Sequence, residues 1–328
     1  MNMSVYSDQL LTIVVPCYNE QEVLPETVKR LGEVLKKLVD EGKIAAQSKL
    51  LFVDDGSKDE TWGLIKKFEK DFEYVTGIKF SRNFGHQNAL LAGMTIAVKY
   101  SQMIITIDAD LQDDINAIYE MIDKYYEGNE VVYGVRNSRK TDTFFKRQTA
   151  MAFYNVMGRL GVSLVPNSAD YRLLSQRAVE SLLDFKERNL FLRGMVPLIG
   201  YQSAKVYYAR KKRFAGKSKY PLKKMIKFAF DGITSFSTVP IRLITNLGLF
   251  IVVVGIILFI YSIIRKIEGN VEIGWTSLMA SIWVIGGIQL ICLSVIGEYI
   301  GKIFKEVKMR PRYTIEQDDY SKKFTEDN

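Results

Sequence analysis

Short apolar runs rich in β-branched residues alternate with helix-like periodicity over the first part of the chain. Each run ends in polar residues, and stretches with apolar positions three or four residues apart separate the runs. This alternation predicts an α/β domain, with a mostly parallel sheet and helices on both of its faces. The expected strands lie at residues 10–18, 49–57, 75–83, 102–110 and 130–136, and the expected helices at residues 20–41, 59–71, 86–100 and 115–127.

Two later stretches, Leu243–Ile264 and Trp275–Ile296, contain no charged residue. Each has roughly 22 residues, enough to cross a hydrocarbon core about 30 Å thick. Buried core helices are the alternative, although soluble helices seldom run this far without a charge. We therefore predict two transmembrane helices. Lysine and arginine residues flank the pair, whereas the connecting loop holds only Arg265 and Lys266, so the positive-inside rule places both ends of the chain in the cytoplasm.

A third apolar pattern precedes the first uncharged stretch. Apolar residues recur at three- and four-residue steps from Leu222 to Phe236, and Lys223, Lys224 and Lys227 fall mostly outside this stripe. The pattern predicts an amphipathic helix in the membrane interface, with its lysines toward anionic headgroups. An ordinary helix packed on the soluble domain is the alternative.

Together these patterns predict a multi-pass membrane protein whose larger part is cytoplasmic. The N-terminus has neither a basic start nor a long apolar core, so we expect no cleaved signal peptide. The tail after Arg312 is expected to be mobile. The expected parts are a cytoplasmic domain at 1–215, juxtamembrane helices at 216–241, a two-helix hairpin at 242–298 and a cytoplasmic tail at 299–328.

The net charge of +8 and the pI near 9.1 narrow the choice of partners. A basic chain suits an anionic membrane, a phosphorylated substrate or nucleic acid. Here the basic residues cluster beside the predicted membrane segments, which disfavours nucleic acid. Cys17 and Cys292 lie far apart, which argues against a disulfide framework and favours a reducing compartment. The single histidine, His86, makes neither a zinc site nor a triad, and we expect it to be a structural or surface residue.

Polar clusters follow four of the expected strands, with the sequences CYNE, DDGS, SRNFGHQNA and DADLQDD. Because ligands bind at the carboxyl ends of the strands in such sheets, the clusters predict a single site. No GxGxxG motif follows the first strand and there is no Walker-type lysine loop, so a phosphate cradle is missing. The site is acidic instead, through Glu20, Asp54, Asp55, Asp108 and Asp110.

The four carboxylates of IITIDADLQDD need a positive counterpart, because like charges repel and partial burial strengthens the repulsion. A divalent cation would supply it and would let an acidic site hold a diphosphate. Oxygen ligands favour Mg²⁺ or Mn²⁺. We predict that Asp108 and Asp110 turn toward one such ion, carried in with a nucleotide diphosphate. Asp54 or Asp55 would then accept hydrogen bonds from the base or the ribose.

The motifs VVPCYNE, VDDGSKDET, SRNFGHQNALLAG and DADLQD, in this order and spacing, resemble those of family 2 glycosyltransferases with the GT-A fold. Later segments resemble polyisoprenyl-phosphate glycosyltransferases, and the length and two C-terminal spans resemble the GtrB-type undecaprenyl-phosphate glucosyltransferases. Those segments read SADYRLLSQRAVE, RKKRFAGKSKYPLKKM and GEYIGKIFKEVKMRPRY. The resemblance covers nearly the whole chain. It implies inverting transfer of one glucose from UDP-glucose to undecaprenyl phosphate at the cytoplasmic membrane face, giving a lipid-linked sugar for later glycosylation.

The resemblance also implies roles for residues at matching positions. Asp113 near the sugar and Asp170 as the proposed base are the implied catalytic residues, and Asp108 and Asp110 the implied metal ligands. The implied nucleotide-sugar pocket consists of Pro16, Tyr18, Glu20, Asp54, Asp55, Asp108 and Gln112. The implied site for the acceptor phosphate consists of Arg210, Arg213, Ser218 and Lys219.

Physical chemistry supports some of these implied roles more strongly than others. A phosphate monoester has a second pKa near 6, so the acceptor is mostly ionised at neutral pH and hardly needs a base. Asp170 would then orient the acceptor or stabilise positive charge on the sugar carbon, or it would only cap the following helix. The basic run from Arg210 to Lys219 would offset repulsion between an anionic acceptor and an anionic donor. A generic anchor for anionic lipids is the alternative.

Other functions stay open at this point. The same reaction with GDP-mannose or a modified UDP-sugar fits the sequence equally well. A processive polysaccharide synthase would carry a Gln-x-x-Arg-Trp motif, but none of the three tryptophans follows an arginine. A non-enzymatic membrane scaffold that binds nucleotide sugars or lipids has no reason to keep so complete an acidic set. Gly286 and Gly287 would allow close helix packing in a homo-oligomer.

Overall fold

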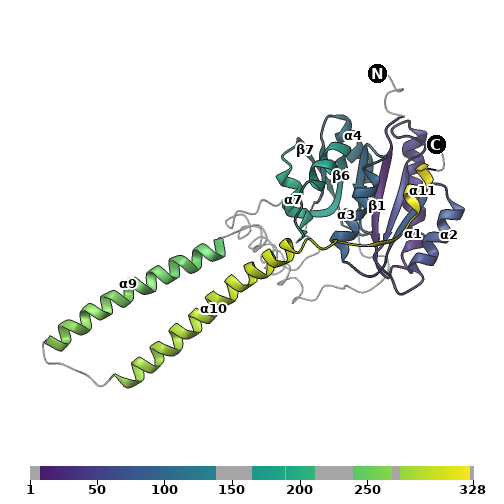
Figure 1. Cartoon of the computed structure of the whole chain (residues 1–328). Coiled ribbons are helices and arrows are strands. Elements are labelled where there is room, and N and C mark those ends of the chain that lie inside the picture. The colour runs from purple at the N-terminus through teal and green to yellow at the C-terminus, as the bar shows by residue number, and fades with distance from the viewer. Residues whose placement is uncertain (1–7, 138–164, 189, 211–238, 268–273, 326–328) are drawn as a thin grey trace. The chain divides into compact units, whose positions relative to one another are not determined.

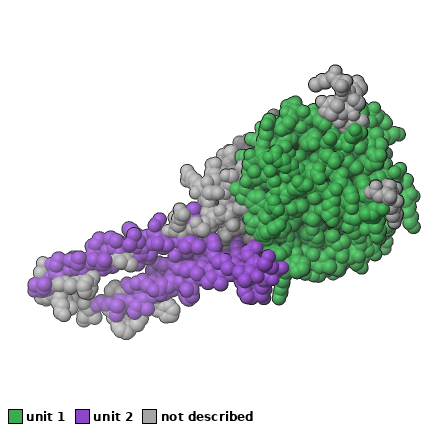
Figure 2. Space-filling model, turned by 45° about the horizontal axis from the view of Figure 1, so that its top comes forward, with its two compact units in different colours: residues 1–154, 163–221, 310–328 green, residues 155–162, 222–309 purple. Residues whose placement is uncertain are grey.

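The computed structural model describes residues 8–137, 165–188, 190–210, 239–267 and 274–325 (Figure 1). The chain divides into two compact units, which Figure 2 colours separately. Unit 1 contains the described residues up to 210 together with those from Arg310 onward. Unit 2 contains the two long helices that lie between them in the sequence. The expected interfacial helix at 222–236 lies outside the described residues.

Unit 1 is built on an 8-stranded sheet. Its strands are β1 (Leu11–Cys17), β2 (Lys49–Asp54), β3 (Val75–Phe80), β4 (Met103–Thr106), β5 (Val131–Arg136), β6 (Ser168–Ser175), β7 (Ser203–Tyr208) and β8 (Ile315–Asp318). They are ordered β7-β5-β6-β4-β1-β2-β3-β8, and β6 and β8 run antiparallel to their neighbours. The mostly parallel sheet and its first five strands confirm the prediction, whereas β6, β7 and β8 were not foreseen.

Helices cover both faces of this sheet. They are α1 (Leu24–Asp40), α2 (Thr61–Asp71), α3 (His86–Ala97), α4 (Ala117–Tyr126), α6 (Gln176–Leu183), α7 (Leu192–Leu198) and α11 (Asp319–Thr325). The first four match the expected helices within a few residues at each end. Each of those four was marked in the sequence by apolar positions at helical spacing between two apolar runs.

The two faces of β1 show how the layers form. Successive side chains of a strand point to opposite faces. Ile13 and Val15 therefore join the core beneath α1, together with Leu31. Val14 faces the other way, toward α3. A Cβ atom on Gly93 would lie 2.3 Å from Cγ1 of Val14, so glycine lets α3 approach the sheet closely. This close packing fixes the helix whose first residue is His86.

The C-terminal segment is a folded part of unit 1, so the expectation of a mobile tail after Arg312 was wrong. Strand β8 pairs antiparallel with β3, with Gln317 opposite Lys79, and Figure 1 shows α11 against the sheet domain. Tyr320 is fully buried, and its hydroxyl lies 2.7 Å from Oγ1 of Thr12. The sequence of this segment is short and polar, which hid both its strand and its helix.

Unit 2 consists of α9 (Val239–Ile267) and α10 (Trp275–Val307). Among the described residues, one stretch is long and apolar enough to cross a membrane, Val284–Val307 within α10. A shorter apolar stretch, Ile244–Ile257, lies in α9, and its role as a second span stays a prediction. α10 continues past the predicted end of the second span at Ile296.

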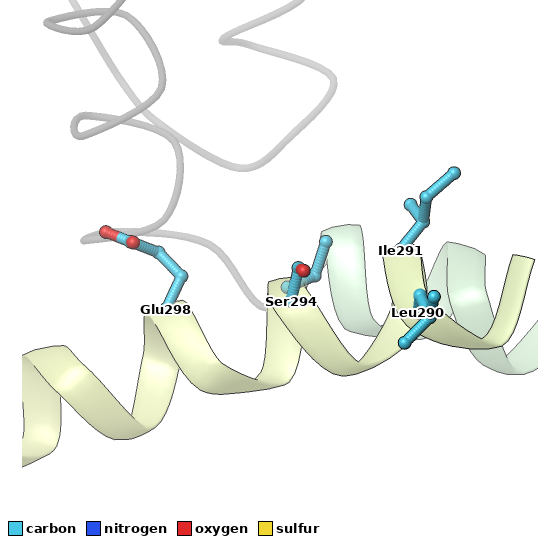
Figure 3. Close-up of a pocket in the computed structure, with 5 residues that line it drawn as sticks. Leu290, Ile291, Ser294 and Glu298 are labelled. Carbon is cyan, nitrogen blue, oxygen red and sulfur yellow. The ribbon is translucent and has the colours of Figure 1, made fainter. Parts of the chain in front are cut away.

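Among the described residues, five side chains of α10 line a hollow on that helix (Figure 3). The lining side chains are Leu290, Ile291, Ser294, Val295 and Glu298. The described part of this lining is mostly apolar, with Glu298 as its one carboxylate.

The anchoring of the C-terminal segment can be tested at Tyr320. The substitution Tyr320→Phe keeps the ring but removes the hydroxyl from Thr12 and Ser101, which remain bonded to each other at 2.7 Å. Losing these two bonds costs about 1–2 kcal/mol, which corresponds to a fall of about 2–8 °C in melting temperature. Thermal unfolding of the full chain in detergent measures this fall. Tyr207→Phe, at an exposed tyrosine of β7, is the matched control and should leave the melting temperature unchanged.

Candidate active site

The polar strand ends that the sequence singled out meet at one edge of the sheet. β1 pairs with β2 on one side and with β4 on the other, so the order of the strands reverses at β1. Such a switch point leaves a crevice at the carboxyl ends of the strands, where ligands bind in sheets of this type. Pro16, Asp54 and Asp108 lie at the ends of these three strands or directly after them.

The loops after β1 and β2 are tied to each other by hydrogen bonds. The backbone N–H of Asn19 donates to Oγ of Ser57 at 2.9 Å, and that of Glu20 donates to Oγ1 of Thr61 at 2.9 Å. Asn19 has a φ of 54°, and its Oδ1 accepts from the N–H of Lys58 at 2.8 Å. These bonds fix the loop that carries Tyr18 and Glu20, both of which are half-buried at this edge.

The two carboxylates of the DDGS motif, Asp54 and Asp55, differ in the hydrogen bonds that they accept. Asp55 accepts from the backbone N–H groups of Phe84 at 2.6 Å and Gly85 at 2.9 Å, one on each oxygen. It therefore holds the loop that leads into α3. Oδ1 of Asp54 accepts from the N–H of Ser57 at 3.2 Å, while its buried Oδ2 has no hydrogen-bond partner among the described residues. Burial raises the pKa of both carboxyls. Of the two, Asp54 has the oxygen available for a ligand.

The loop after β4 carries the Asp-x-Asp motif and is held from several sides. Leu111 has a φ of 54°, and the N–H of Gln112 donates to Oδ1 of Asp110 at 3.1 Å. Oγ1 of Thr27 donates to the carbonyl of Ala109 at 2.8 Å. These bonds fix the turn between the two predicted metal ligands.

Asp113 helps to hold this loop in place. It is 3% exposed, and its Oδ1 accepts from the hydroxyl of Tyr208 at 2.6 Å and from Nη2 of Arg136 at 3.2 Å. These partners lie at the ends of β7 and β5, so Asp113 joins the Asp-x-Asp loop to that side of the sheet. Burial raises the pKa of Tyr208, and Asp113 adds to the shift. A direct role of Asp113 in catalysis stays a prediction.

His86 lies between two of the predicted site carboxylates, which corrects the expectation that it is a structural or surface residue. Its Nε2 is 3.5 Å from Oδ1 of Asp108 and 3.6 Å from Oδ2 of Asp170. Burial lowers the pKa of His86, but Asp170 and Asp108 outweigh it and raise the pKa to about 9. The imidazole is thus a cation at neutral pH. Part of the positive charge that the acidic loop requires comes from the chain itself.

The same arrangement shifts the pKa values of Asp108 and Asp170. Burial raises the pKa of Asp108 to about 6, although His86 opposes the shift. Burial also disfavours ionisation of Asp170, but Arg193, His86 and Arg172 together hold its pKa well below the usual range. Asp108 and Asp170 therefore sit on opposite sides of the imidazole with opposite shifts. Asp170 is the carboxylate that stays ionised without help from a ligand.

Two arginines clamp Asp170. Nη2 of Arg172 donates to its Oδ1 at 2.5 Å, and Nη2 of Arg193 donates to its Oδ2 at 3.0 Å. Asp170 and Arg172 are both almost fully buried. Both carboxylate oxygens of Asp170 are thus engaged by guanidinium groups. The place of Asp170 on β6, two residues before Arg172, excludes a simple cap of the following helix, which Ser175 caps instead.

One of the four predicted acceptor residues can be placed. Arg210 follows β7, and its Nη2 donates to Oε1 of Gln112 in the Asp-x-Asp loop. This contact joins a residue predicted for the lipid phosphate to a residue predicted for the sugar donor. Arg213, Ser218 and Lys219 lie outside the described residues.

The residues present fit a divalent ion only with help from a ligand. Within the described part of the chain, no group of three or more His, Cys, Asp or Glu side chains is arranged to hold a metal. Mg²⁺ is commonly bound by one or two carboxylates together with substrate phosphates. Asp108 and Asp110 offer such a pair of hard oxygen donors, and the buried Oδ1 of Asp108 accepts no hydrogen bond from the described residues. A diphosphate would have to complete the coordination.

Comparison with known proteins identifies the family. Residues 12–183, which include the whole acidic strand-end site, match Glycosyl transferase family 2. The chain is a family 2 glycosyltransferase. This membership establishes the activity class and the GT-A fold that the motifs predicted. Residues 239–303, which span most of α9 and α10, match a second family, the GtrB C-terminal hairpin.

Similar proteins align with this glycosyltransferase over nearly its full length. It is 54% identical over 319 residues to the uncharacterized glycosyltransferase YkoT of Bacillus subtilis, covering 97% of this chain and 95% of that one. It is 38% identical over 312 residues to the SfII prophage-derived bactoprenol glucosyl transferase of Shigella flexneri, covering 94% and 97%. Among solved structures, glucosyl-3-phosphoglycerate synthase of Mycobacterium tuberculosis has a TM-score of 0.47 and 16% identity, covering 72% and 83%, too distant to inform on ligands.

The sequence analysis missed three charged residues of this site, namely His86, Arg172 and Arg193. Arg172 was detectable, because residues two apart on a strand share a face and it follows Asp170 at that spacing. His86 stands in the SRNFGHQNA cluster at a strand end, and that position was a better guide than its being the sole histidine. Arg193 gave no local signal, since α7 reaches Asp170 only through the tertiary fold.

The role of His86 can be tested by His86→Gln, which keeps a hydrogen-bond donor but removes the positive charge between Asp108 and Asp170. We expect turnover to fall about tenfold or more, the scale of losing one preorganised electrostatic group. Transfer of radiolabelled sugar at saturating donor measures turnover, and a thermal scan of the same sample reports on folding. Unchanged turnover in a folded variant would contradict this role.

Proposed function

We propose that the protein transfers one glucose from UDP-glucose, with inversion, to undecaprenyl phosphate at the cytoplasmic face of a membrane. The product would be a lipid-linked sugar for later glycosylation. One observation carries the proposal: a family 2 domain and a GtrB-type hairpin occur in one chain, and relatives that align over both are named bactoprenol glucosyl transferase. The donor nucleotide and sugar come from the sequence resemblance, and GDP-mannose or another UDP-sugar remains the alternative donor.

The geometry of the site supports donor binding at the carboxyl ends of β1, β2 and β4. Asp54 would accept a hydrogen bond from the nucleoside on its unpartnered oxygen. Pro16, Tyr18 and Glu20 would line the same pocket from the loop after β1. Asp108 and Asp110 would hold Mg²⁺ or Mn²⁺ together with the diphosphate. When bound, the ion would neutralise the leaving diphosphate as the glycosidic bond breaks.

In this mechanism an ionised oxygen of the acceptor phosphate attacks the anomeric carbon of glucose. The bond from that carbon to the diphosphate breaks on the opposite face, so the configuration inverts and UDP leaves. No proton has to be removed, because the acceptor phosphate is already mostly ionised. Asp170, held as a carboxylate by Arg172 and Arg193, would orient the acceptor or stabilise positive charge that develops on the sugar.

The acceptor would approach from the side of Arg210. Its contact with Gln112 brings a cation to the Asp-x-Asp loop, and Arg213, Ser218 and Lys219 continue the basic run along the chain. The exposed apolar surface of Val284–Val307 supports membrane attachment, because no part of that stretch is buried within the described structure. A second span formed by α9, with both chain ends in the cytoplasm, completes the proposed topology.

The reaction can be tested by incubating the full-length protein with radiolabelled UDP-glucose, GDP-mannose and other UDP-sugars, each with undecaprenyl phosphate. We expect label in the lipid fraction with UDP-glucose and Mg²⁺, and none in the presence of a chelator. Asp110→Asn should lower transfer about a hundredfold or more, because it removes a metal ligand and its charge. Asp184→Asn, which makes the same change at an exposed carboxylate, should retain full transfer. Full transfer by Asp110→Asn would contradict the metal assignment, and label from another donor only would replace UDP-glucose.

The acceptor site can be tested separately by reversing the charge at Arg210. Arg210→Glu should raise the KM for undecaprenyl phosphate about tenfold, as expected on losing a charge-assisted contact to phosphate, while the KM for the donor changes less. The matched control is Arg177→Glu, at an exposed arginine that pairs with Glu130. If Arg210→Glu left lipid use untouched, or if both variants weakened it equally, Arg210 would have no specific part in acceptor binding.

A further inference from the structure

An aromatic stack connects the C-terminal segment to the loop that begins at the end of β3. The rings of Tyr313 and Phe80 are nearly parallel, with an angle of 8° and centroids 5.2 Å apart. Phe84 meets Phe80 edge-on, at 89° and 5.7 Å. The guanidinium of Arg82 covers the ring of Phe84 at 3.9 Å. We call Tyr313, Phe80 and Phe84 the aromatic stack. All of its members belong to unit 1.

The loop held by this stack, Ser81–Gly85, is part of the candidate donor site. The backbone N–H groups of Phe84 and Gly85 bind Asp55, and the next residue along the chain is His86. A Cβ atom on Gly56 would lie 2.4 Å from the carbonyl carbon of Arg82, so the loop lies directly against the DDGS turn. Any displacement of this loop would therefore move the wall of the pocket and the start of α3 together.

The C-terminal segment is bonded to the chain on both sides of the point where the loop begins. The N–H of Ser81 donates to the carbonyl of Thr314 at 3.1 Å, directly beside the aromatic stack. Nζ of Lys79 lies 3.0 Å from Oε2 of Glu316. Further along, Tyr320 is buried among Thr12, Ser101 and Tyr100. Tyr313 thus lies two residues before β8, in a segment held on one side by the Ser81–Thr314 bond and on the other by buried Tyr320.

We propose that Tyr313 is a positioning residue for nucleotide binding: through Phe80 and Phe84 it holds the Ser81–Gly85 loop against Asp55 and the DDGS turn. Tyr313 does not touch the proposed reacting groups, and it acts only through the two phenylalanines. The segment that follows α10 in the chain therefore supports the donor site from outside it. The identity of the ligand, UDP, rests on the proposed function. The contact by which Tyr313 holds the loop is independent of that function.

The test compares Tyr313→Ala with Tyr313→Phe and Phe324→Ala in the full-length protein in detergent. Tyr313→Phe keeps the stacking ring. Phe324→Ala removes an aromatic side chain from the same C-terminal segment, where it stacks on Tyr100 at 4.5 Å, away from the loop. Two quantities are measured on each: hydrogen exchange of peptides that cover residues 81–86, and the dissociation constant of UDP with Mg²⁺ by calorimetry.

Tyr313→Ala should speed exchange in residues 81–86 and weaken UDP binding about three- to tenfold, the range expected for loss of one aromatic pair. In transfer assays it should raise the KM for the donor more than it lowers kcat. Tyr313→Phe should restore wild-type values. Phe324→Ala should lower the melting temperature but leave loop exchange and UDP binding unchanged. If Tyr313 acted only through the overall stability of the protein, Phe324→Ala would change loop exchange and UDP binding as well.

Two results would overturn the inference. One is unchanged exchange of residues 81–86 in Tyr313→Ala, and the other is an equal effect of Phe324→Ala on exchange and binding. Failure of the proposed function gives a different pattern, in which the wild-type protein itself does not bind UDP. In that case the exchange comparison still decides whether Tyr313 holds the loop.

Discussion

The site depends on one buried carboxylate, Asp170, and on the three cations that surround it. Burying an ion costs several kcal/mol unless partners replace the lost water. Arg172 and Arg193 replace it on the two oxygens, and His86 adds a third contact on the side of Asp108. This arrangement keeps Asp170 charged, keeps His86 charged and leaves Asp108 with a raised pKa. The pKa values of the two carboxyls are thus shifted in opposite directions, although both carboxyls face the same imidazole.

The frame around these charges is made of contacts that are distant in sequence. Asp113 binds residues at the ends of β5 and β7, and Thr27 of α1 holds the backbone of the Asp-x-Asp loop. Arg210, next after β7, binds Gln112 of that loop. The loop is therefore fixed by both halves of the sheet before any ligand arrives. Such preorganisation means that little binding energy is needed to order the site.

The sequence predicted the first five strands, four helices and the polar strand ends because each of these is a local pattern. β1 to β4 are parallel neighbours buried on both faces, so their apolar runs stand out and their carboxyl ends must share an edge. β6 gave no such signal, because Asp170 and Arg172 interrupt its apolar pattern with two buried charges. β8 and α11 were missed because a short polar strand acquires its structure only by pairing with β3, a contact that no local window reveals. His86 was misjudged by its residue type alone, although its position beside a strand end carried the information.

The position of β8 in the chain also determines when the sheet can be completed during synthesis. Until β8 arrives, β3 is an open edge with unpaired backbone groups, and such edges invite pairing with other chains. β8 and α11 come after α9 and α10 in the chain, so the ribosome synthesises the strand that pairs with β3 after both hairpin helices. The catalytic domain therefore reaches its final form only once the hairpin has emerged, and chains that stop short of residue 315 would leave the edge uncovered. Completion of the sheet is in this way tied to prior synthesis of α9 and α10.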